Sequence, residues 1–247
     1  MNYGIYNQLQ LREIFHLEFL RRFGRKVKAE FYAVKGGTNL RFFFKSIRYS
    51  EDMDIDLKGV RVNFIKDTVM NILENADFRN NLKSYDVEDI IPPDMPRAKQ
   101  TETTQRFKVH LITSSGEDLF TKVEFSRRGF KGDIVVEEVA GNVLRAYKMA
   151  PLVIPHYDMR SAVMQKIGAL AARPAIQARD IFDLYIMSSQ YQPIAAEGLT
   201  AGPSKVARAH ENLFEVSFEQ FRDTVVSYLA IEEQALYTSA ERWDEIK

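Results

Sequence analysis

The chain has 247 residues, 45% of them hydrophobic and 28% charged, which is typical of a folded globular protein with one large domain or two modest ones. It contains no cysteine, so disulfides, thiolate nucleophiles and cysteine-bound zinc are excluded. The 34 basic residues balance 34 acidic ones, and attraction of nucleic acid by the charge of the whole protein is therefore not indicated.

The N-terminal region predicts a protein that begins with a helix. It has no basic segment followed by an apolar run, so no signal peptide is predicted, and no run of about 18 apolar residues occurs in the chain. A soluble cytoplasmic protein is the expectation. Residues 5–23 carry apolar side chains at helical spacing, and Gly24 is expected to end this helix.

Two local clusters of basic residues could contact nucleic acid although the net charge is zero. Solvated surface is the commoner role of such clusters. Their members are Arg21, Arg22, Arg25, Lys26 and Lys28 in the first, and Arg127, Arg128 and Lys131 in the second.

A glycine-rich turn follows the first strand, which is predicted over residues 29–34. The turn reads Lys35-Gly36-Gly37-Thr38, and a helix capped by Thr38 is expected after it. Two glycines let backbone N–H groups approach a ligand closely, and a helix N-terminus favours phosphate. The hydroxyl of Thr38 could add a further contact. The alternative is an ordinary tight turn.

An acidic strand comes next, over residues 53–57. Side chains alternate along a strand, so Asp52, Asp54 and Asp56 share one face and the apolar residues between them share the other. Three like charges this close are unfavourable unless something neutralises them. Mg²⁺ binds carboxylates together with substrate phosphates, so a metal site is one interpretation and a solvated edge strand is the other.

The turn and the acidic strand together indicate a functional site more strongly than either does alone. One helix fits between them, so a triphosphate on the turn and metals on the carboxylates would meet in one cleft. Phosphoryl transfer requires this arrangement.

A third acidic residue for such a site is expected on a later strand. Residues 62–73 predict a helix and residues 91–103 a proline-rich loop, followed by three strands joined as antiparallel hairpins over 105–112, 119–125 and 133–139. Glu124 lies in the middle of these strands, with apolar neighbours on the opposite face. It is the candidate, although an exposed strand residue is the alternative.

The second half of the chain predicts helices. They are expected over 160–172, over 178–189, and after the capping box Ser217-Phe218-Glu219-Gln220, with a loop over 192–205. The predicted organisation is a mixed α+β domain over 1–145 and a mainly helical domain over 146–247.

At this point the sequence resembles the AbiEii/MenT-type nucleotidyltransferase toxins of the polymerase-β-like nucleotidyltransferase superfamily. The resemblance lies in segment 35–40 and in Arg48-Tyr49-Ser50-Glu51-Asp52-Met53-Asp54, where tyrosine replaces the usual phenylalanine. It implies a polymerase-β-like domain with a mixed sheet, followed by a helical C-terminal domain. It aligns the metal pair with Asp52 and Asp54, while the shifted pair Asp54 and Asp56 stays open.

Two helical motifs downstream extend the resemblance. Segment 164–170 contains Lys166, and segment 178–185 contains Asp180 and Asp183. The resemblance implies that Lys166 contacts nucleotide phosphates and that Asp183 supports that lysine or the site. The alternatives are a surface lysine and an ion pair between helices. Asp180 is expected to pair with an arginine.

The resemblance also implies a function. The expected enzyme uses Mg²⁺ or Mn²⁺ to transfer a nucleotide from an NTP to a hydroxyl acceptor, with RNA such as the 3′ end of tRNA as the acceptor. It would act as the toxin of a toxin–antitoxin or phage-defence pair, with an antitoxin encoded nearby. A protein or small-molecule acceptor, and a non-catalytic module that binds nucleotide or RNA, are the alternatives. The nucleotide base and the oligomeric state are left open.

Overall fold

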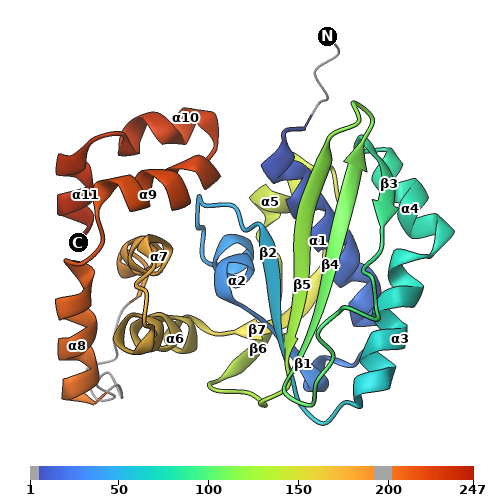
Figure 1. Cartoon of the computed structure of the whole chain (residues 1–247), viewed down its shortest axis with the longest axis horizontal. Helices are drawn as coiled ribbons and strands as arrows, with labels where there is room; N and C mark the ends of the chain where they lie inside the picture. Colours follow the sequence, from blue (N-terminus) through green and yellow to red (C-terminus); the bar gives the residue numbers. More distant parts are fainter. Residues whose placement is uncertain (1–5, 192–201) are drawn as a thin grey trace. The chain divides into compact units, whose positions relative to one another are not determined.

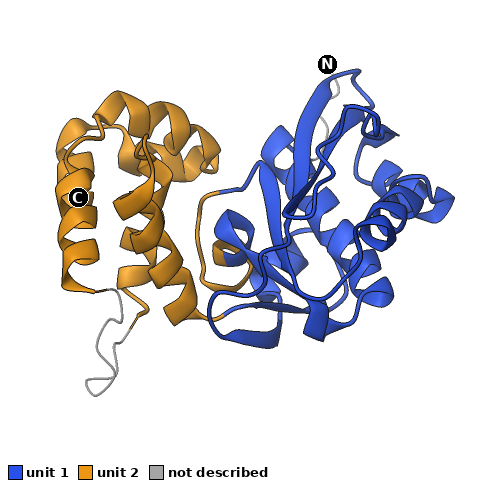
Figure 2. Cartoon of the chain, turned by 60° about the horizontal axis from the view of Figure 1, so that its bottom comes forward, with its two compact units in different colours: residues 1–39, 49–157 blue, residues 40–48, 158–247 orange. Residues whose placement is uncertain are grey.

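The computed structural model describes residues 6–191 and 202–247. They form two compact units, which Figure 2 shows in different colours. The first unit is built from residues 1–39 and 49–157, and the second from residues 40–48 and 158–247. The α+β fold expected from the sequence is confirmed.

The first unit is organised around one seven-stranded mixed sheet. Strands β2 and β5 pair in parallel, as do β1 and β7, and the other neighbours are antiparallel. In spatial order the strands are β3 (Val87–Ile91), β4 (Thr104–Thr113), β5 (Asp118–Ser126), β2 (Asp52–Leu57), β1 (Tyr32–Lys35), β7 (Val153–Tyr157) and β6 (Ile134–Glu138).

Helices α1 (Gln8–Lys26), α3 (Val62–Leu73) and α4 (Ala76–Lys83) pack against one face of this sheet (Figure 1). Phe23 of α1 lies 5.3 Å from Phe125 of β5, measured between ring centroids, and Phe15 lies 5.9 Å from Phe78 of α4. Since strand residues alternate, Glu124 and the aspartates of β2 lie on the opposite face. These three helices therefore cover the face of the sheet opposite the acidic residues.

Helix α1 runs past Gly24 to Lys26, so the predicted end at Gly24 is wrong. A Cβ atom at Gly24 would come within 2.9 Å of the Tyr32 hydroxyl. The glycine therefore permits close packing of the helix on β1. Residues Ala29–Phe31 form a 3-10 turn, so the predicted strand over 29–34 begins later, at Tyr32.

A buried histidine joins α1 to the sheet. His16 is fully buried, and its Nε2 lies 2.9 Å from the Thr121 hydroxyl, which donates to the carbonyl of Glu51. His16 therefore donates through Nε2. Burial, with a smaller contribution from Arg12, lowers the pKa of His16 from 6.5 to about 3.

The buried His16 should make the free energy of unfolding depend on pH. The unfolded chain takes up a proton at His16 below pH 6.5 and the folded chain does not, so stability is complete above 6.5 and falls toward pH 3. We expect His16 to account for about 2 kcal/mol of lost unfolding free energy between pH 6.5 and 5. Urea titrations should give a shallower pH dependence for His16→Gln, which keeps the hydrogen bond. Parallel pH profiles would refute this assignment.

The edge of the sheet beyond β1 differs from the prediction. β4 and β5 form the expected hairpin, but β6 pairs with β7 rather than with β5. β7 was not predicted, because Pro155 and His156 interrupt any strand pattern in a short segment. It belongs to the first unit, which ends at residue 157 rather than at the expected 145.

The second unit is helical, and its core is aromatic. Phe221 stacks on Trp243 at 4.2 Å, and Phe182 contacts Tyr237 edge to face at 5.3 Å. Leu40 and Phe44, at the end of α2 (Gly36–Phe43) and just after it, join this core. The helices that follow are α6 (Met159–Ala172), α7 (Ala178–Ser188), α8 (Pro203–Leu213), α9 (Phe218–Thr224), α10 (Ile231–Gln234) and α11 (Ala240–Ile246).

The helices predicted over 160–172 and 178–189 and the capping box at Ser217 are present. Of the loop predicted over 192–205, residues 192–201 lie outside the described part of the chain. Residues 203–205 instead begin α8, with proline in its first turn. None of the described helices is long and apolar enough to cross a membrane.

Candidate functional site

The predicted acidic residues gather on one face of the sheet in the first unit. In β2, the backbones of Met53 and Ile55 direct their side chains into the core, where they are fully buried, so the aspartates point the other way. Parallel pairing with β5 places Asp54 opposite Glu124. The structure therefore brings the predicted third acidic residue next to the acidic strand.

Asp56 is held inside the fold by two partners. One carboxylate oxygen accepts from the Lys35 ammonium at 2.6 Å, and the other accepts from the Tyr157 hydroxyl at 2.7 Å. Its side chain is 6% exposed. Both oxygens are occupied, so Asp56 has the environment of a structural residue.

Asp52 keeps one oxygen without a partner. Its Oδ2 pairs with Lys122 at 2.9 Å, but its Oδ1 is buried and has no hydrogen-bond partner among the described residues. A buried oxygen that accepts nothing is costly. A cation or donor that is bound there would remove this cost.

The side chain of Asp54 forms no hydrogen bond or ion pair within the described ranges. Burial raises its pKa; Lys35 opposes this, Glu124 adds to it, Lys122 opposes it and Asp52 adds to it. The net direction is upward, so the ionised form of Asp54 needs more positive charge than the protein supplies. This is the expected state of a carboxylate that binds a cation.

The glycine turn lies against Asp54. Gly36 begins α2 with a φ of 67°, a conformation that L side chains rarely adopt. A Cβ atom there would lie 3.2 Å from Asp54 Oδ2. The glycine thus permits the backbone turn and leaves space beside the carboxylate.

Gly36→Ala should therefore impair both stability and catalysis. The strained φ costs about 1–2 kcal/mol, and displacement of Asp54 should lower the rate on the order of tenfold to a hundredfold. Gly59→Ala is the matched control, since Gly59 has a φ of 70° but open space around it. Thermal unfolding should show similar losses for both variants, and an activity assay should separate them. Equal activity in the two variants would show that the contact with Asp54 is unimportant.

Thr38 has a different contact from the one predicted. It is buried, and its hydroxyl donates to the backbone carbonyl of Asp52 at 3.2 Å. The Ser50 hydroxyl donates to the same carbonyl at 2.7 Å. The hydroxyl of Thr38 thus positions Asp52. A contact between Thr38 and phosphate remains a prediction only for its backbone N–H group. The helix begins at Gly36, so the predicted cap at Thr38 is wrong.

Glu124 is paired with a cation that the sequence did not indicate. Its Oε2 accepts from Arg106 Nε of β4 at 2.7 Å, while its Oε1 has no partner among the described residues. In the described part of the chain, no three His, Cys, Asp or Glu side chains converge as ready metal ligands. The two unpartnered aspartate positions, Asp52 Oδ1 and the carboxylate of Asp54, are nevertheless oxygen donors of the kind that Mg²⁺ prefers.

Lys166 and Asp183 form a buried ion-pair network in the second unit. The Lys166 ammonium lies 2.6 Å from Asp183 and 2.8 Å from Asp180, and Arg173 pairs with Asp180. Lys166 therefore uses two of its three N–H donors on these carboxylates. The arginine partner expected for Asp180 is present.

Arg48 is the member of this network that sequence reasoning missed. Its guanidinium donates to both oxygens of Asp183, at 3.0 to 3.2 Å, and both side chains are buried. Burial alone would raise the pKa of Asp183, but Arg48 and Lys166 outweigh it and lower that pKa. Arg48 lies in segment 48–54, which carries the family resemblance, and this was the signal in the sequence from which its role could have been inferred.

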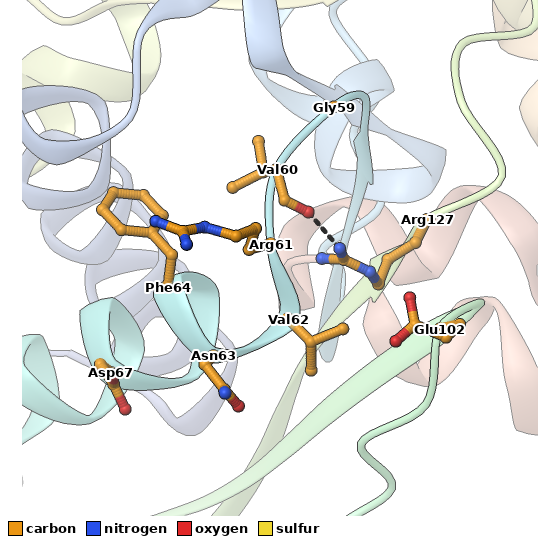
Figure 3. A pocket seen from close by; sticks show the side chains of 9 residues that line it. All are labelled: Gly59, Val60, Arg61, Val62, Asn63, Phe64, Asp67, Glu102 and Arg127. Atoms are coloured by element: carbon orange, nitrogen blue, oxygen red, sulfur yellow. Dashed lines mark hydrogen bonds between the residues drawn. The ribbon is translucent and has the colours of Figure 1, made fainter.

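A cavity of about 790 Å³ lies at the turn that follows β2 (Figure 3), and neither Asp52 nor Asp54 lines it. Arg127 crosses it and donates to the carbonyls of Val60 and the Gln105 side chain. Arg21, from the other predicted basic cluster, donates to the carbonyls of Ala150 and Pro151. Both arginines are thus used within the fold.

Comparisons with known proteins identify the family and the fold. The family model described as nucleotidyl transferase AbiEii toxin, type IV TA system, matches residues 18–243. The structure is similar to MenT4, a nucleotidyltransferase toxin from Mycobacterium tuberculosis, with 16% identity, coverage of 97% of this chain and 84% of that one, and a TM-score of 0.62. It is also similar to JHP933 from Helicobacter pylori, with 17% identity, 98% and 93% coverage and a TM-score of 0.54. No curated protein matches the sequence.

Proposed function

The chain belongs to the AbiEii nucleotidyltransferase toxins of type IV toxin–antitoxin systems, and we propose that it transfers a nucleotide from an NTP to an RNA hydroxyl with the help of Mg²⁺ or Mn²⁺. The observation that carries the proposal is the pair Asp52 and Asp54: Asp52 Oδ1 is buried without a partner among the described residues, and the Asp54 carboxylate lies beside the Gly36 turn. Membership of the family also implies an antitoxin partner.

Asp52 and Asp54 are the proposed metal ligands, and Glu124 completes their site through its free oxygen. The metal, when bound, supplies charge that stabilises the phosphates and acidifies the acceptor hydroxyl. Asp56 is left out, since Lys35 and Tyr157 occupy both of its oxygens. This supports the pair Asp52 and Asp54 over the shifted pair Asp54 and Asp56.

The remaining residues bind and orient the substrate. The N–H groups at the start of α2, over Gly36, Gly37 and Thr38, are proposed to bind the triphosphate. Lys166 has one N–H donor left and is proposed to contact phosphate, held in place by Asp183. Lys35 and Lys122 limit the negative charge of the acidic face before substrate arrives.

In the proposed reaction, the acceptor oxygen forms a bond to the α-phosphorus of the NTP. The bond from that phosphorus to the bridging oxygen of the β-phosphate breaks, and pyrophosphate leaves. The hydroxyl proton goes to Glu124 or to solvent. The acceptor is proposed to be RNA, with the 3′ end of tRNA as the specific candidate, and the biological role is proposed to be growth arrest in phage defence, countered by an antitoxin encoded nearby.

The test is incubation with labelled NTPs, Mg²⁺ and a cell extract, followed by separation of RNA, protein and small molecules. Label in the RNA fraction is the expected result. Label in protein or in small molecules would overturn the choice of acceptor while keeping the reaction. No label in any fraction, with each of the four NTPs, would overturn the reaction itself.

A further inference from the structure

A basic groove lies along β4, one strand beyond Glu124. Arg106 pairs in register with Glu124, Lys108 with Lys122, and residues paired directly across a sheet share a face. Hence Arg106, Lys108 and His110 lie on the same sheet face as the acidic residues. The groove, of about 470 Å³, is called the β4 groove, and its lining includes Ile91, Pro92, Lys99, Arg106, Lys108 and His110.

The charge of the β4 groove is positive and only partly neutralised. Arg106 is paired with Glu124, His110 Nδ1 lies 2.9 Å from the Asp118 carboxylate, and Arg97, 89% exposed, pairs with Asp94 at 3.4 Å. Lys99 and Lys108 are exposed and make no ion pair with any described residue. The groove therefore presents free lysine charge although the chain as a whole is neutral.

The shape of the groove suits an extended polyanion rather than a single anion. Successive residues on one face of a strand are about 6.6 Å apart, so Arg106, Lys108 and His110 span about 13 Å along β4. Ile91 is exposed, and with Pro92 it adds an apolar surface beside these charges. A positively charged groove that follows the nucleic-acid backbone is typical of single-stranded nucleic-acid sites.

We propose that the β4 groove binds the phosphodiester backbone of a single-stranded segment of the acceptor RNA, and that Arg106 lies where this strand reaches Glu124. The inference rests on the proposed function and adds the surface that holds the acceptor. Lys99 and Lys108 supply the phosphate contacts, and the free hydroxyl end of the strand leads toward Asp52 and Asp54.

The experiment measures binding of a short fluorescent oligoribonucleotide of mixed sequence, without NTP, over a range of salt concentrations. The test variant is K99Q/K108Q. Glutamine is chosen rather than glutamate because it removes the lysine charge without placing a negative charge opposite Lys122, the cross-strand partner of Lys108. The control K26Q/K28Q makes the same charge change at two exposed lysines near the end of α1. Both pairs are exposed, so unchanged thermal unfolding is expected.

We expect K99Q/K108Q to bind about tenfold more weakly, with a log–log salt slope shallower by about 1.4, because each phosphate contact on a single strand contributes about 0.7. The control should bind like the wild type. Equal affinity of K99Q/K108Q and wild type, or an equal loss in the control, would overturn the proposal. So would an equal loss of affinity for polyglutamate, which would indicate an acidic protein as the partner.

Different experimental results would refute the groove and the proposed reaction. Magnesium-dependent NTP binding should be the same in K99Q/K108Q and wild type, because neither lysine belongs to the proposed NTP site. If RNA is labelled but its binding ignores both lysines, the groove is wrong and the reaction stands. If no acceptor is labelled but RNA binding still requires both lysines, the reaction is wrong and the surface stands.

Discussion

Asp54→Asn should abolish nucleotidyl transfer while leaving the protein folded. A metal-bound carboxylate contributes several kcal/mol to the transition state, and about 4 kcal/mol corresponds to a thousandfold loss of rate. Asparagine has the same shape but removes a half-buried charge that the fold disfavours, as the raised pKa of Asp54 indicates. The melting temperature should therefore stay the same or rise. Activity would be lost without a loss of stability, as expected for a functional carboxylate.

Asp56→Asn is the matched control for this variant. Asp56 lies on the same face of the same strand, but its carboxylate binds Lys35 and Tyr157. Its replacement should lower stability and reduce activity much less than Asp54→Asn. The reverse pattern, with Asp54→Asn active and Asp56→Asn inactive at unchanged stability, would contradict the proposed site.

Asp183→Asn should destabilise the second unit by about 3–5 kcal/mol, the usual cost of removing one partner from a buried ion pair. It would leave the guanidinium of Arg48 buried and remove one partner of Lys166. The only tryptophan of the chain, Trp243, is buried in this unit, so its fluorescence during urea unfolding reports the loss.

The control replaces Asp180, which is equally buried. Arg173, one of its partners, is 41% exposed and can turn to water, so Asp180→Asn should cost less than Asp183→Asn. A triple variant with Arg48→Met, Lys166→Met and Asp183→Leu should regain part of the lost stability, because no unpaired charge is left buried. If Asp183→Asn unfolds at the same urea concentration as wild type, the network does not hold this unit together.

The sequence predicted the parts of the molecule that depend on local pattern. Alternation along 52–57 identified the acidic face, and apolar spacing over 62–73 identified α3 with its bounds. β7 and α8 were missed, because β7 contains proline and is buried by neighbours distant in sequence, while α8 has little buried surface to produce a pattern. Pairing of β6 with β7 depends on strand order, which local pattern does not contain.

The candidate site shows the same division. The aspartates, Glu124 and Gly36 were identified because their residue types and spacing point to a chemistry. Their partners Lys122 and Arg106 were not, since a cross-strand contact is known only once the register of β2, β4 and β5 is known. Thr38 was assigned a phosphate contact because the sequence does not show that its hydroxyl turns back to the Asp52 carbonyl.

The most direct test of a metal-dependent nucleotidyl transfer compares NTPs that are labelled on the α- or the γ-phosphate. Each is incubated with the protein, Mg²⁺ and total RNA, with and without a chelator, and with Asp54→Asn in parallel. We expect that α-label enters RNA, that γ-label does not, and that the chelator and Asp54→Asn both prevent incorporation. Incorporation of the γ-label, or of α-label that persists in chelator and in Asp54→Asn, would contradict it.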